Sequence, residues 1–177
     1  GLFETPRLPA LAFSDELGEY PSSFTAGWES VGSVQQLREG AYAGTWYVLP
    51  TLNAPYVDTL TGEVRGRVTV TYLTMESCTE CYDVTIHRTF LEASRITPYV
   101  EHTYDLSSPA GQALIEEYNI TAVPMIILSA EAEEYENLRP GWPLVGTVAA
   151  DGSYVLRNLQ RLQLVYYDLT REEVMRP

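Results

Sequence analysis

The chain of 177 residues contains no lysine and only two cysteines and two histidines. Its 11 basic residues, all arginine, face 24 acidic ones, so the formal net charge is −13. This balance argues against DNA, RNA and anionic membranes as partners, because binding to them depends on a basic surface. The longest apolar run, Val123–Leu128, is far shorter than the roughly 20 residues of a membrane span. We therefore expect no nucleic-acid partner and no insertion of these residues into a membrane.

The two cysteines lie three residues apart, in Cys78-Thr79-Glu80-Cys81. Such a pair forms a dithiol or disulfide, or contributes to a metal site. A four-ligand zinc site needs a second pair, or two histidines at short spacing. His87 would lie well round a helix from Cys81, and His102 falls on a later predicted strand. We expect no metal and no cofactor, and keep copper handling by the pair and one histidine as a minor hypothesis.

The segments around the pair predict a strand, a turn and a helix. Residues 67–73 are rich in β-branched and aromatic side chains, which is typical of a strand. Residues 82–94 carry an apolar stripe at helical spacing. The cysteines therefore fall on a strand-to-helix turn, where free N–H groups at the start of the helix would stabilise a thiolate on Cys78.

A second strand, a second helix and a third strand follow. Residues 99–104 read as a strand, and Ser108-Pro109 predicts a helix start with serine as N-cap and proline in the first turn. The run Val123–Leu128 predicts a buried strand. Pro124 stands at the entrance of that strand, where it has no amide to donate to the sheet.

This succession resembles the thioredoxin superfamily over residues 67–157. The resemblance implies an α/β fold with a central mixed sheet flanked by helices. It also implies that Cys78 is the attacking thiol and Cys81 the resolving thiol. Pro124 corresponds to the cis-proline of the family and, with Val123, would line the substrate groove. An extended substrate chain would add to the backbone of Val123.

Two positions depart from the pattern of that family, and two acidic residues bear on the redox potential. Ser77 replaces the usual tryptophan, and Tyr72 replaces the buried acid that would assist proton transfer. Glu76 and Glu80 oppose thiolate formation on Cys78. We therefore expect a potential nearer about −270 mV than −120 mV, on the reducing side.

The first part of the chain repeats features of its last part. Gly-Trp-x-x-Val-Gly-x-Val occurs at residues 27–34 and again at residues 141–148, and Tyr56 and Asp58 match Tyr166 and Asp168. We interpret residues 1–66 as a β-rich half unit that begins at its own proline strand, Pro9 matching Pro124. This half unit would dock on a thioredoxin-like domain at residues 67–177, with Trp28 and Trp142 buried in related settings.

The leading functional hypothesis is an enzyme, a thiol–disulfide oxidoreductase acting on protein thiols and disulfides. The alternative is a non-catalytic extracytoplasmic interaction module in which the disulfide is structural. We expect an extracytoplasmic or secreted chain, downstream of a removed leader or anchor before Gly1, with the cytoplasm as the alternative.

Overall fold

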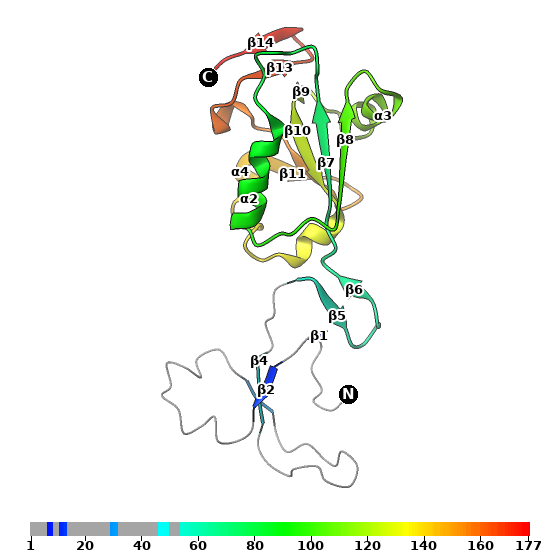
Figure 1. The fold of residues 1–177 in the computed structure, drawn as a ribbon, viewed down its shortest axis with the longest axis vertical. Helices are drawn as coiled ribbons and strands as arrows, with labels where there is room; N and C mark the ends of the chain where they lie inside the picture. The colour runs from blue at the N-terminus through cyan, green and yellow to red at the C-terminus, as the bar shows by residue number, and fades with distance from the viewer. Residues whose placement is uncertain (1–6, 9–10, 14–28, 32–45, 50–53) are drawn as a thin grey trace. The chain divides into compact units, whose positions relative to one another are not determined.

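The computed structural model describes residues 7–8, 11–13, 29–31, 46–49 and 54–177. The chain divides into two compact units, Gly1–Arg65 and Gly66–Pro177, drawn in blue to cyan and in green to red in Figure 1. Each unit is described by itself.

The described part of the first unit forms two small antiparallel sheets. One has the strand order β1-β5-β6 and the other the order β2-β4-β3. The strands are β1 (Arg7–Leu8), β2 (Leu11–Phe13), β3 (Glu29–Val31), β4 (Trp46–Leu49), β5 (Tyr56–Asp58) and β6 (Val64–Arg65).

The second unit is mixed α/β, with a five-stranded mixed sheet of order β11-β12-β10-β7-β8 (Figure 1). Strands β7 and β8 are parallel, and the other neighbours are antiparallel. A separate three-stranded sheet has the order β14-β13-β9. The strands are β7 (Thr69–Thr74), β8 (Val100–Asp105), β9 (Ala122–Val123), β10 (Met125–Leu128), β11 (Gly146–Val148), β12 (Tyr154–Leu156), β13 (Tyr166–Asp168) and β14 (Glu173–Met175).

The helices of the second unit are short. They are the 3-10 helices η2 (Val84–Ile86), η3 (Ala130–Glu134) and η4 (Gln160–Leu162), and the α-helices α2 (His87–Ala93), α3 (Pro109–Tyr118) and α4 (Trp142–Val145). Two of the predicted features at α3 are confirmed, since Ser108 is its N-cap and Pro109 its first residue. The Ser108 hydroxyl accepts from the Gly111 amide at 3.0 Å. Asn119 then ends α3 in the left-handed region, at φ 49°.

The core of the second unit lies around β7 and β10. All four residues of β10 are buried, which agrees with the unbroken apolar run predicted to be a strand. Helix α2 crosses one face of the sheet in Figure 1 and buries Leu91. Trp142 of α4 is also buried, and its ring lies 6.3 Å from that of Phe90 on α2. Strands β7 and β10 and helix α2 therefore contribute to one core.

Strand pairing in the two units follows the same order and register. In the first unit Leu8 pairs with Val57, and Arg7 pairs with Asp58. In the second unit Val123 pairs with Tyr167, and Ala122 pairs with Asp168. The matched residues Asp58 and Asp168 also accept backbone amides from the following turn in the same way. The sheet β2-β4-β3 of the first unit likewise has the strand order of β10-β12-β11 in the second unit.

One part of the repeat alignment does not correspond in structure. The alignment sets Glu29–Val31 against residues 143–145, but the first is a strand whereas the second lies in α4. Trp142 is 2% exposed, whereas its counterpart Trp28, like Pro9, lies outside the described residues. Docking of the half unit stays a prediction.

Candidate functional site

Cys78 and Cys81 form a disulfide in the loop that follows the central strand β7. The S–S distance is 2.00 Å and the two Cα atoms are 5.4 Å apart. Within this loop the Cys78 amide donates to the Met75 carbonyl at 3.0 Å, and the Cys81 amide donates to the Cys78 carbonyl at 3.3 Å. Both cysteines are half-buried, while Glu76, Ser77, Thr79 and Glu80 beside them are exposed. The disulfide thus lies in an exposed loop at the end of a central strand.

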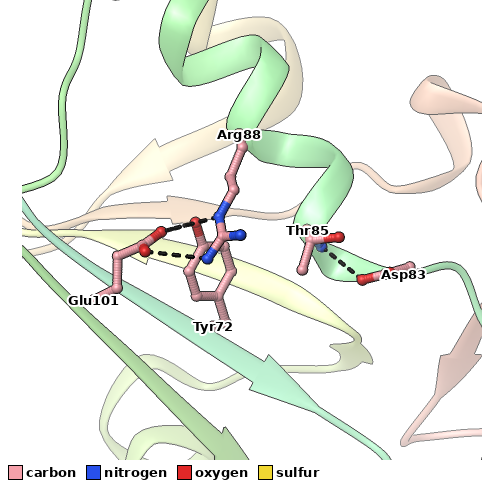
Figure 2. A network of polar contacts seen from close by, with 5 residues as sticks. All are labelled: Tyr72, Asp83, Thr85, Arg88 and Glu101. Carbon is pink, nitrogen blue, oxygen red and sulfur yellow. Dashed lines mark hydrogen bonds and ion pairs between the residues drawn. The ribbon is translucent and has the colours of Figure 1, made fainter.

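The helix after this loop starts later than the sequence suggested. Asp83 caps the 3-10 turn η2 by accepting from the Thr85 amide at 2.9 Å (Figure 2). Helix α2 begins only at His87. The expected placement of Cys78 at the N-terminus of a helix is therefore wrong, because aspartate is a strong N-cap and stops the helix before it reaches the cysteines. Helix α2 therefore begins six residues after Cys81 along the chain.

Tyr82, next to the disulfide, joins three parts of the unit. Its amide donates to the Val165 carbonyl at 2.9 Å, and its hydroxyl donates to the Pro124 carbonyl at 2.8 Å. The same hydroxyl lies 2.9 Å from Nε2 of His87. A tyrosine has one hydroxyl proton, so Nε2 of His87 must be the donor in that second bond. Tyr82 thereby ties the cysteine loop to α2 and to the proline that precedes β10.

Burial keeps both side chains of this link uncharged near neutral pH. Burial lowers the pKa of His87 to about 4 and raises the pKa of Tyr82 above its ordinary value. The ring of Tyr82 meets the ring of His87 edge-on, with their centres 5.5 Å apart. The sequence gives little sign of the role of Tyr82, since its only signal is an aromatic residue directly after the motif.

The two predicted groove residues, Val123 and Pro124, are buried, and the peptide bond between them is cis, as the resemblance implies. The open edge expected beside Val123 is already occupied, because β13 pairs with β9 there and sets Tyr167 opposite Val123. The Leu169 amide extends this pairing by donating to the Thr121 carbonyl at 2.8 Å. The expectation of a vacant edge for substrate is wrong in this structure, because the last residues of the unit fold back onto it.

The two predicted acidic residues have different surroundings. The Glu76 amide donates to Oδ2 of Asp105 at 2.7 Å. Hydrogen bonds from the Ser107 side chain and then from this amide hold the pKa of Asp105 below its ordinary value. A second carboxylate therefore lies at the base of the cysteine loop. Glu80, in contrast, forms an ion pair with Arg176 near the end of the chain. Arg176 thus offsets the charge of Glu80, and the sequence motif alone gave no sign of this contact.

Tyr72 of β7 takes part in a network on the side of α2 (Figure 2). Its hydroxyl donates to Glu101 at 2.6 Å, and Arg88 of α2 donates to the same carboxylate at 3.3 and 3.1 Å. Burial and then the bond to Glu101 raise the pKa of Tyr72 to about 12. Bonds from Tyr72 and then Arg88 lower the pKa of Glu101. This network fastens α2 to β8.

The described residues bring together no group of three or more histidine, cysteine or acidic side chains that could hold a metal ion. They therefore offer no ligand set for the copper-handling hypothesis. In the same part of the chain, no helix has the length and apolar character needed to cross a bilayer. Comparison of the chain with protein-family models, with curated proteins and with solved structures finds no match.

Proposed function

We propose that this chain is a thiol–disulfide oxidoreductase whose second unit is thioredoxin-like. The observation that carries the proposal is the Cys78–Cys81 disulfide, set in an exposed loop at the end of β7 and linked through Tyr82 to Pro124. A closely spaced pair in such a loop is open to attack by an external thiol. The other sequence element that the proposal needs, the proline segment, is held beside that loop by a direct hydrogen bond.

The order of elements around the pair supports the thioredoxin-like assignment. Strand β7, the cysteine loop and α2 lead to β8, which is parallel to β7. Helix α3 then leads through the proline to β10, which is antiparallel to β7 on its other side. This is the succession on which the resemblance rests, and the comparisons with known proteins add nothing to it.

The proposed reaction is an exchange of two electrons between dithiols and disulfides. In the reduced protein, the Cys78 thiolate attacks a substrate disulfide and expels one substrate sulfur as a thiolate. The Cys81 thiolate then attacks the Cys78 sulfur of the mixed disulfide and releases the second substrate sulfur. The substrate leaves with two thiols after protonation, and the protein keeps the Cys78–Cys81 disulfide. An external dithiol returns the protein to its reduced state.

Local charge supports a potential on the reducing side. Asp105 and Glu76 add carboxylates near the start of the loop, and these oppose a stable thiolate on Cys78, although Arg176 offsets Glu80. Helix α2 begins only at His87, so no helix start at Cys78 stabilises that thiolate. We expect a potential near about −270 mV rather than −120 mV. Equilibration of the protein with glutathione or dithiothreitol measures it, and a strongly oxidising value would show that the charge argument fails.

A second candidate function is a non-catalytic interaction module with a structural disulfide. Two observations favour it, namely the half-burial of both cysteines and the occupation of the Val123 edge by β13. On either proposal we expect an extracytoplasmic or secreted protein, where disulfides persist.

Reduction of insulin by the full chain, with dithiothreitol as electron source, separates the two candidates. If the chain is an oxidoreductase, the wild type reduces insulin catalytically and Cys78→Ser does not. Ser77→Ala, a control in the same loop, keeps the activity. Equal rates for the wild type and Cys78→Ser would leave only the interaction module.

A further inference from the structure

Residues 165–176, here called the C-terminal hairpin, include β13 and β14 and lie against the proposed redox site. We infer that this hairpin occupies the edge of β9 to which a substrate would add. The contacts of Val165 and Arg176 with the cysteine loop, here called the latch, hold it there, and their release controls access of protein substrates. The inference rests on the proposed function, and it concerns the regulation of that site.

The hairpin fills the backbone edge to which a substrate chain would add. Tyr167 pairs with Val123 and Asp168 with Ala122, in antiparallel register. The Leu169 amide continues the pairing with a bond to Thr121. A strand edge takes one neighbour on each side, so an extended polypeptide can pair with this side of β9 only after β13 has left it.

Both ends of the hairpin contact the loop that carries the disulfide. At the start, the Val165 carbonyl accepts from the Tyr82 amide, directly after Cys81. At the end, Arg176 forms its ion pair with Glu80, which lies between the two cysteines. A protein disulfide approaching Cys78 therefore meets the residues that hold the hairpin in place. A small disulfide needs no backbone pairing with β9, so it can react without displacing the hairpin.

The first unit has the same hairpin pairing without a cysteine pair, so it shows which contacts belong to the repeated fold. There, β1, β5 and β6 pair in the register of β9, β13 and β14, although both cysteines of the chain lie in the second unit. Pairing of such a hairpin with the strand before the proline thus belongs to the repeated architecture. The contacts of Val165 and Arg176 with the cysteine loop are additions at the redox site, and these are what a regulatory step would change.

The ion pair of the latch, between Arg176 and Glu80, is weak enough to break reversibly. The Arg176 and Glu80 side chains are 61% and 59% exposed. Exposed ion pairs stabilise a structure only slightly, so loss of this one should shift the hairpin equilibrium by about 2- to 5-fold. We expect a change of that size, rather than an all-or-none switch, when the latch is broken.

The test compares two disulfides against the reduced full chain: oxidised glutathione, which is small, and insulin, which is a polypeptide. We expect Arg176→Glu to raise the insulin rate relative to the glutathione rate by about 2- to 5-fold. The double variant Glu80→Arg/Arg176→Glu should return the ratio towards the wild-type value. Arg161→Glu, at an exposed arginine of η4 outside the hairpin, makes the same charge change and should leave the ratio as it is.

Hydrogen exchange at the Leu169 amide, which is bonded to Thr121, reports whether the hairpin opens. We expect the Leu169 amide to exchange about 2- to 5-fold faster in Arg176→Glu than in the wild type. An unchanged insulin-to-glutathione ratio overturns the inference, whether or not the amide exchanges faster, and the proposed function then stands if both disulfides are still reduced. If the wild type reduces neither disulfide, the proposed function itself fails, and the inference fails with it.

Discussion

Acidification between pH 7 and 5 should destabilise the second unit through His87. This side chain is 6% exposed, and burial lowers its pKa from 6.5 to about 4. In the unfolded chain the imidazole takes up a proton as the pH falls through 6.5, whereas in the folded chain it stays neutral down to about 4. Folding stability due to the neutral ring is therefore complete above pH 6.5 and is lost progressively between pH 6.5 and 4.

The size of the effect follows from these two pKa values. The linkage relation gives a loss of about 2 kcal/mol by pH 5 and about 3 kcal/mol by pH 4. Glu101, Asp105 and Asp151 have pKa values below their ordinary ones, so their contributions are lost only at lower pH. The change in unfolding free energy between pH 7 and 5 thus reports on His87 and not on these three carboxylates.

Urea unfolding followed by circular dichroism at pH 7, 6 and 5 measures the loss, and an NMR titration of the imidazole measures the pKa directly. His87→Gln keeps a donor for Tyr82 but removes the titration, so it should lose about 2 kcal/mol less than the wild type over this interval. His102→Gln, at an exposed position of β8, makes the same substitution away from Tyr82 and is the control. A His87 pKa near 6.5, or equal losses in the wild type and His87→Gln, would show that the buried neutral ring does not cause the pH dependence.

Three further predictions concern packing and hydrogen bonds. Gly146→Ala should cost about 1–3 kcal/mol in urea unfolding, because a Cβ there would lie 2.6 Å from a backbone oxygen of β12; Gly141→Ala, with nothing within 4 Å, is the control. Tyr72→Phe should raise the pKa of Glu101 towards its ordinary 4.5, measurable by carboxyl NMR, since the bond that lowers it most is removed. Tyr82→Phe should cost about 1–3 kcal/mol by leaving the proline carbonyl without its donor; an unchanged unfolding midpoint would contradict this.

Local patterns predicted β7, β8, α3 and β10 of the second unit, but not β11 to β14. The β-branched run led to β7, the Ser108-Pro109 pair led to α3, and the unbroken apolar run led to β10. Each of these signals depends on the chemistry of adjacent residues, so it can be detected without knowledge of tertiary contacts. The start of the helix after the cysteines differs from the prediction although its signal is local, because Asp83 is an N-cap and the helical residues begin only after it.

The environment of the disulfide could not be predicted in the same way. Arg176 and Glu80 are separated by 96 positions, and β13 pairs with β9 across more than 40 residues of chain. No local pattern specifies such contacts. The internal repeat contains part of this information, because it aligns Asp58 with Asp168, and both residues lie in hairpins that pair with the strand before a proline.

Trapping of a mixed disulfide tests whether Cys78 is the attacking thiol of an oxidoreductase. Reduced Cys81→Ser and reduced Cys78→Ser chains are mixed with a disulfide-bonded protein substrate, and covalent adducts are identified by intact mass and by their reversal with dithiothreitol. We expect a lasting adduct through Cys78 in Cys81→Ser and little or none through Cys81 in Cys78→Ser. Absence of an adduct in both variants, or equal adducts in both, would contradict the assignment of Cys78 as the attacking thiol.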